Sequence, residues 1–128
     1  MPRIDSSNYI QQDAFVKEKF MSTGNIFLQL QERLSDIHNL RAAAALLEWD
    51  MEVCMPPKGA EARGRQLGTL ILLAHQQFID GETYRLLQAA QEQQDCLTDD
   101  QRILLREVAY DYHRAVRIPE SFMRRFSE

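Results

Sequence analysis

Apolar residues recur every three or four positions along most of the sequence, which is the spacing of one face of an α-helix. The longest stripe begins at Ile26 and ends at Met51, and its steps are 4-4-3-3-4-3-4. This spacing predicts one helix from about residue 26 to residue 54, whose apolar face must be covered by another helix. The stripe consists of Ile26, Leu30, Leu34, Ile37, Leu40, Ala44, Leu47 and Met51.

The sequence after this stripe predicts that the chain turns back. Pro56-Pro57 ends the first helix, because proline lacks an amide donor and restricts the residue before it. A second stripe then predicts a helix over about 59–78, packed on the first in a long αα-hairpin. We expect Gly64 and Gly68 to allow close backbone contact with the alanine run at 42–45. The second stripe consists of Leu67, Leu70, Ile71, Ala74 and Phe78.

The start of the chain forms a segment of its own in this pattern. Its apolar spacing predicts a helix, and the run Ser22-Thr23-Gly24-Asn25 predicts the end of that helix. Gly24 suits the left-handed position that closes a helix, and Asn25 can cap the next one. The sequence therefore predicts an N-terminal extension helix over 1–24 and a helical domain over 25–128.

Three shorter helices are predicted after the hairpin. The first covers about 82–93, and Thr98-Asp99-Asp100-Gln101 then matches a capping box that begins the second. Ile118-Pro119 ends the second, and proline suits the first turn of the third. The inward positions of the second are Leu104, Leu105, Val108, Tyr112, Ala115 and Val116. With few glycines and prolines for tight turns, the predicted fold class is all-α, a helical bundle built on the αα-hairpin.

Composition narrows the class of protein further. The chain has 128 residues, 45% of them apolar and 27% charged, values typical of a soluble globular domain. The net charge is -4 and no clustered basic face is present, which argues against nucleic-acid binding. No apolar run approaches the ~20 residues that span a bilayer, and no signal peptide is present. We therefore expect a cytoplasmic protein whose two cysteines, Cys54 and Cys96, are reduced.

Residue spacing gives no catalytic or metal-ligating set. The three histidines are at least 37 residues apart, so the paired spacing of a zinc helix is absent. No serine or cysteine occurs in an activating motif. The acidic residues Glu48, Asp50 and Glu52 point in different directions on a helix, which favours solvated or locally paired roles. The histidines are His38, His75 and His113.

The segment 46–63, LLEWDMEVCMPPKGAEAR, closely resembles the N-terminal signature of the carboxypeptidase Taq family of metallocarboxypeptidases. In that family a long helix ends in Trp-Asp, Met-Pro follows, and a Gly-Gly-Ala-x-x-Arg turn opens the next helix. Two further stretches, 70–80 and 104–119, also resemble the family. Lys58 stands where a first glycine is usual, and Cys54 where an aromatic residue is common. The signature residues, to which we assign structural roles, are Trp49, Asp50, Met55, Pro56, Pro57, Gly59, Ala60, Glu61 and Arg63.

The resemblance implies an N-terminal piece of a larger, almost wholly helical enzyme. Members of the family are cytoplasmic homodimers that remove C-terminal residues from peptides, and their early helices form one wall of the substrate groove. Their zinc or cobalt is held by an HExxH helix and a downstream Glu, and it activates a water with the motif's Glu as general base. The resemblance thus implies a homo-oligomer and a peptide substrate.

The sequence contains no HExxH motif, and two hypotheses follow. In the first, the chain is the groove-wall portion of a metallocarboxypeptidase, has no catalytic residue or cofactor of its own, and is inactive alone. In the second, it is a stand-alone helical binding or regulatory module without catalysis. At the elbow between the two long helices we expect Trp49 to be mostly buried. We also expect Asp50 to accept hydrogen bonds from the backbone or from Arg63.

Overall fold

The computed structural model describes residues 6–54 and 56–125, with side chains at Gln11 and over 24–54 and 56–123. Five α-helices and two short 3-10 helices make up this part of the chain, and it contains no strand. The predicted all-α class is therefore confirmed. No helix within the described ranges combines the length and the apolar character needed to cross a membrane.

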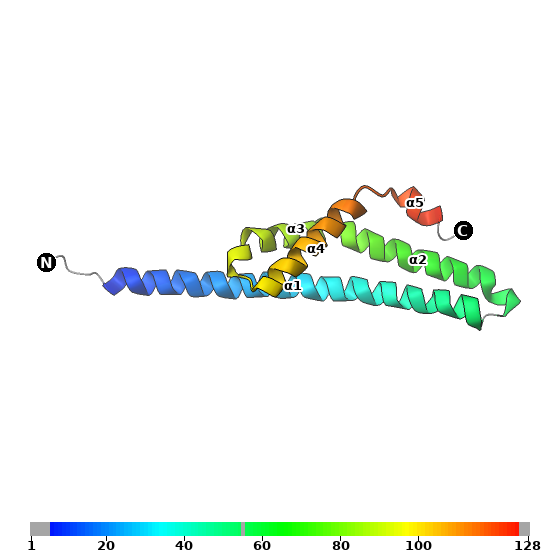
Figure 1. Cartoon of the computed structure of the whole chain (residues 1–128), viewed down its shortest axis with the longest axis horizontal. Coiled ribbons are helices and arrows are strands. Elements are labelled where there is room, and N and C mark those ends of the chain that lie inside the picture. The colour runs from blue at the N-terminus through cyan, green and yellow to red at the C-terminus, as the bar shows by residue number, and fades with distance from the viewer. Residues whose placement is uncertain (1–5, 55, 126–128) are drawn as a thin grey trace.

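A long antiparallel hairpin of α1 and α2 organises the fold, and α3, α4 and α5 all lie on the same side of α1 (Figure 1). α3 packs against α1, whereas α4 packs against α2 and α3, and α5 returns along α2. The N-terminal end of α1 extends beyond the other helices (Figure 1). The elements are α1 Ser6–Val53, η1 Pro57–Gly59, α2 Ala60–Ile79, α3 Gly81–Glu92, η2 Gln94–Cys96, α4 Asp99–Ala115 and α5 Glu120–Arg125.

The predicted helix break at residues 22–25 is wrong. α1 runs without interruption through Gly24, and no described residue has a positive φ. A glycine inside a helix costs about 1 kcal/mol relative to alanine, but it keeps its amide donor, so it weakens the helix without ending it. The division of the chain into an extension over 1–24 and a domain over 25–128 remains a prediction.

The hydrophobic core lies where α1, α2, α3 and α4 meet. None of the eight predicted stripe positions of α1 is exposed, and Leu30 and Ile37 are almost completely buried. In α4 the buried residues are Leu105, Ala109 and Tyr112, whereas Leu104 and Val116 are exposed, contrary to the prediction. Leu104 lies about 100° around the helix from Leu105, so both cannot face the same core.

The predicted glycine contact between α1 and α2 is not formed as expected. Gly68 is buried, but no atom outside the helix backbone lies within 4 Å of where a Cβ of Gly64 would be. Of the alanine run at 42–45, only Ala44 is buried. The larger side chains of Leu67 and Ile71 line a cavity of about 220 Å³ between the two helices. The predicted close contact is therefore not made at Gly64, where the space beside the backbone is open.

A partly buried polar network, which the sequence pattern did not indicate, joins α1 to the corner between α2 and α3. Arg33 Nε donates to Thr83 Oγ1 at 2.6 Å, and Arg33 Nη2 pairs with Asp80 Oδ2 at 2.8 Å. The Thr83 hydroxyl donates to the carbonyl oxygen of Gln77 at 2.6 Å. Asp80 Oδ1 in turn accepts from the amide of Gly81 at 2.8 Å and caps α3. This network fixes the angle at which the chain leaves the hairpin.

Tyr112 makes the free energy of unfolding decrease at alkaline pH. Burial is the main cause that raises the pKa of its phenol, and Tyr84 and Asp80 raise it further. In the unfolded chain the phenol ionises near its usual pKa of about 10. The unfolded state then loses its proton first, so the free energy of unfolding falls as the pH rises above that value.

We expect Tyr112→Phe to flatten this alkaline decrease, and Tyr110→Phe, whose side chain is exposed on the same helix, to leave it unchanged. Urea denaturation between about pH 8 and about pH 11 measures the slope for both variants. Equal slopes for the two variants would show that burial of Tyr112 does not cause the decrease.

Candidate functional site

The elbow between α1 and α2 contains most of the residues that carry the sequence signature. The amide of Cys54 donates to the carbonyl of Asp50 at 3.0 Å in the last turn of α1. The amide of Gly59 donates to the carbonyl of Pro56 at 2.9 Å and closes a single 3-10 turn. No left-handed residue is needed in this turn, which explains why Lys58 is tolerated there.

Asp50 and Arg63 join the two helices across the elbow, as predicted. Arg63 Nη1 donates to Asp50 Oδ2 at 2.5 Å, and both side chains are partly exposed. Glu61 pairs with Arg65 on the outer surface of α2. The first pair fixes the elbow, whereas the second lies within one helix.

Removal of the Asp50 carboxylate should therefore weaken the elbow. We expect Asp50→Ala to lower the free energy of unfolding by about 0.5–1 kcal/mol, because solvent screens a partly exposed ion pair. Glu61→Ala, which breaks a largely exposed pair, should cost about half as much or less. Urea denaturation at low and high salt measures both effects, and the Asp50 effect should shrink as salt is added. An unchanged midpoint for Asp50→Ala would argue against this role.

Trp49 is exposed, and the prediction that its ring is buried in the elbow is wrong. The side chain retains 55% of its accessible surface. Trp49 lies two residues from Leu47 and two from Met51, both of which face the core side of α1. Two residues correspond to about 200° of rotation, so Trp49 points away from the hairpin.

The other signature residues are gathered at the surface of the elbow. Gly59 is half-buried, and Met55 lies outside the described residues. The exposed members are Pro56, Pro57, Ala60 and Glu61. The elbow thus brings the described signature residues together, most of them at its surface.

The described residues do not provide a metal site. His38 lies exposed on α1, His75 is buried on α2, and His113 is exposed on α4. No group of three His, Cys, Asp or Glu side chains in the described ranges is placed to hold a metal ion. The Nε2 atom of His75 is buried and has no hydrogen-bond partner among these residues. The histidine, cysteine and carboxylate side chains of the described residues therefore do not fit the zinc or cobalt that the resemblance implies.

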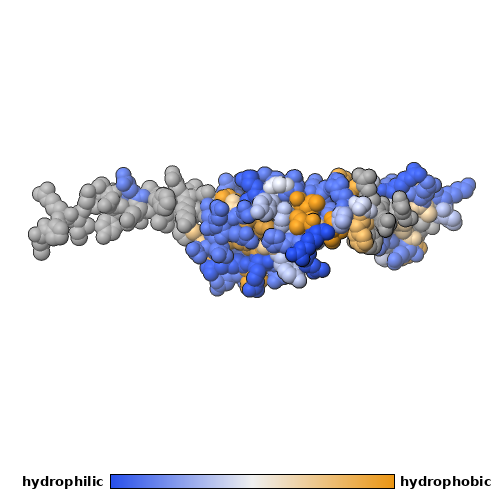
Figure 2. All heavy atoms as spheres, turned by 90° about the horizontal axis from the view of Figure 1, so that it is seen from above, coloured by the Kyte–Doolittle hydropathy of each residue, from blue (hydrophilic) through white to orange (hydrophobic). Residues whose placement is uncertain are grey.

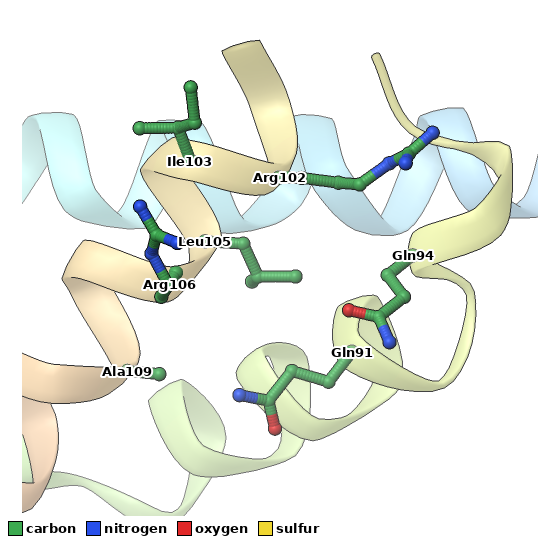
Figure 3. A pocket seen from close by; sticks show the side chains of 7 residues that line it. All are labelled: Gln91, Gln94, Arg102, Ile103, Leu105, Arg106 and Ala109. Atoms are coloured by element: carbon green, nitrogen blue, oxygen red, sulfur yellow. The ribbon is translucent and has the colours of Figure 1, made fainter. Parts of the chain in front are cut away.

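An open pocket of about 330 Å³ lies between the end of α3 and the side of α4 (Figure 3). Gln91 and Gln94 extend into it from one side, and Leu105, Arg106 and Ala109 line it from α4. Arg102 is held by the carbonyl oxygen of Leu97, at 3.2 Å from Nε and 3.0 Å from Nη2. The lining amide and guanidinium groups can bind a polar group, but none of them transfers a proton near neutral pH.

Glu82 and Arg85 form an ion pair on the exposed surface of α3. The hydrogen bond from Arg85 lowers the pKa of the Glu82 carboxyl, and the same bond raises the pKa of the guanidinium. Both side chains are exposed to solvent. The pair is therefore a solvated surface contact and provides no catalytic acid or base.

A comparison with family models decides the relationship of this chain to known proteins. The model of the carboxypeptidase Taq (M32) metallopeptidase family matches residues 29–128. The chain belongs to this family. The match covers the hairpin from within α1 onward, together with α3, α4 and α5. The resemblance of the elbow signature to the carboxypeptidase Taq family is thereby confirmed.

A curated relative supports the same assignment to the carboxypeptidase Taq family. Thermostable carboxypeptidase 1 of Thermus thermophilus is 37% identical to this chain over 84 residues. The matched segment is 63% of this chain but 16% of the relative, so the chain spans about a sixth of the protein that it matches. No solved structure gives a significant match.

Proposed function

We propose that this chain is the N-terminal, groove-wall portion of a metal-dependent carboxypeptidase that releases C-terminal amino acids from peptides. The observation that carries the proposal is the family match over residues 29–128, which includes the whole elbow. The named activity of the Thermus thermophilus relative, a carboxypeptidase, supports the reaction class.

The surface of the described region supports a place within a larger protein. Large apolar side chains are exposed on α1, α2, α4 and α5, and apolar patches interrupt the polar surface on the side of α4 (Figure 2). Extended apolar patches on a small protein mark surfaces that other polypeptide covers. This pattern also supports the proposed homo-oligomer, because exposed apolar surface favours association. The exposed apolar residues of α4 are Ile103, Leu104 and Tyr110.

The metal, zinc or cobalt, belongs in this proposal to residues beyond those described here. The described donor set does not hold a metal ion, and the cavity beside His75 lacks further histidine, cysteine or aspartate. The chain would act by shaping and supporting the groove of a cytoplasmic enzyme. Its residues would bind no peptide carboxylate and transfer no proton.

The 128-residue chain alone is accordingly expected to bind no stoichiometric metal and to cleave no peptide. Metal content after dialysis, measured together with release of the C-terminal residue from an N-blocked dipeptide, tests both expectations. Catalytic zinc requires three protein ligands and an oriented second shell, which this donor set does not supply. One zinc per chain with metal-dependent release would place the chemistry in this chain and contradict the proposal.

A further inference from the structure

The last part of α1 is apolar on two opposite faces. One face packs into the hairpin, and we call the other the elbow face. At 100° per residue the elbow-face residues fall within about 60° of arc, opposite the inner stripe. Apolar residues on two opposite faces are typical of a helix that is covered on both sides in the complete protein. The elbow face consists of Ala42, Leu46, Trp49 and Val53, with steps of 4-3-4.

The elbow face has no cover among the described residues. Leu46, Trp49 and Val53 keep 67%, 55% and 59% of their accessible surface. The other helices all lie on the opposite side of α1 (Figure 1). A row of large apolar side chains at helical spacing, beside the signature turn, is typical of a surface that receives another helix.

The charges beside the elbow face define the chemistry of its partner. Glu52 lies on one flank, is exposed, and is in no ion pair within the described ranges. Glu48 lies farther round the helix, where it lines the cavity between α1 and α2. On the other flank Asp50 is already paired with Arg63. A matching helix would carry an apolar stripe flanked by lysine or arginine on the side of Glu52.

We propose that the elbow face packs against a basic amphipathic helix from the part of the metallopeptidase that lies outside the matched segment. This inference rests on the proposed function and adds the surface through which the hairpin joins the rest of the enzyme. In the Thermus thermophilus relative, more than four-fifths of the polypeptide lies outside the match and is available to supply such a helix.

A second copy of this chain fits the elbow face less well. Two copies would bring two unpaired Glu52 carboxylates to one contact, and like charges repel. α1 also ends at Val53, so two elbow faces could overlap over only roughly 18 Å of helix. Such a contact falls short of the ~800 Å² per partner of a standard interface.

The test compares one substitution in two proteins. The first is the 128-residue chain, and the second is a chimera in which residues 29–128 replace the matching segment of the Thermus thermophilus carboxypeptidase. Trp49→Ala should leave the melting temperature of the chain alone unchanged, and should lower that of the chimera by at least about 3 °C. Trp49→Phe, which keeps an aromatic ring, should retain most of the chimera's stability.

The charge of the partner is tested in the same way. Glu52→Lys should lower the melting temperature of the chimera and not that of the chain. Glu61→Lys, away from the elbow face, should have the same small effect in both proteins, because it breaks only the pair with Arg65. The proposal would be overturned if Trp49→Ala changed the melting temperature of neither protein, or lowered it equally in both. A neutral Glu52→Lys in the chimera would overturn the basic character of the partner.

Fluorescence of Trp49, the only tryptophan in the chain, tests whether a second copy of the chain occupies the elbow face. Emission from the chain alone should be independent of its concentration. A blue shift on concentration, together with dimers in sedimentation, would assign the elbow face to a second copy and overturn the proposal. Peptide release by the chimera is scored separately. An inactive chimera in which Trp49→Ala still destabilises only the larger protein would contradict the proposed function and support the docking surface.

Discussion

Leu30→Ala should lower the free energy of unfolding of the chain by about 2–5 kcal/mol. Leu30 is 1% exposed and belongs to the core cluster between α1 and the helices that cover it. The substitution removes buried methyl groups and leaves a cavity that a close-packed core fills only in part. This is the largest effect that we expect from a single change in the described region.

The matched control is Leu28→Ala, two residues away on the same helix. Leu28 is 53% exposed, so its loss should change the free energy of unfolding by less than about 0.5 kcal/mol. Both changes have the same effect on helix propensity, and only burial differs. Urea denaturation followed by circular dichroism measures both variants. Similar midpoints would mean that α1 is not packed against the core in this register.

Thr83→Val should lower the free energy of unfolding by about 1–3 kcal/mol. Thr83 is completely buried, and its hydroxyl links Arg33 on α1 to the carbonyl of Gln77 at the end of α2. Valine keeps the shape of the side chain but leaves the Nε donor of Arg33 without its partner, and the Gln77 carbonyl keeps only the 3.3 Å bond from Arg33 Nη2. The expected loss is therefore mainly the cost of unsatisfied polar groups.

Thr69→Val provides the control for this substitution. The Thr69 hydroxyl donates to the carbonyl of Arg65 in its own helix, on an exposed surface. Its removal should cost less than about 0.5 kcal/mol. The comparison isolates the network from the general effect of replacing threonine by valine, and equal stabilities for the two variants would contradict a structural role for the Arg33–Thr83 contact.

Local chemistry made much of the fold predictable from the sequence. Proline is excluded from a helix interior because it lacks the amide donor and clashes with the preceding turn, so Pro56 and Pro57 located the elbow to within a few residues. The capping box at Thr98 also formed as predicted, because both of its hydrogen bonds are made within four residues. The apolar stripe of α1 identified the core face, because the period of a helix fixes which residues share a side.

Features that depend on contacts between distant residues were not predictable in the same way. The continuity of α1 through Gly24 depends on a balance of about 1 kcal/mol, which the residue type alone does not decide. The Arg33–Thr83 network joins residues 50 positions apart and leaves no periodic signal. Trp49 was expected to fill the elbow because large rings are usually buried, yet its position on the helix directs it outward.

The sequence identified the residues of the candidate site but not their arrangement in space. The type and order of residues 46–63 identified the family, and the pairing of Asp50 with Arg63 followed from their positions on either side of the turn. The sequence did not reveal that α1 has a second apolar face. The residues of the inner stripe and of the elbow face alternate along the same stretch of sequence. Only the structure separates those that face the hairpin from those that face away.

The rate of peptide cleavage by the chimera tests the central claim most directly, namely that this hairpin is a working part of a metal-dependent carboxypeptidase. We expect the chimera to release the C-terminal residue of an N-blocked dipeptide in a metal-dependent reaction, with kcat/KM within about tenfold of the unmodified Thermus thermophilus enzyme. Leu30→Ala in the chimera should reduce activity at elevated temperature. A folded chimera that binds its metal and yet releases no amino acid would contradict the claim.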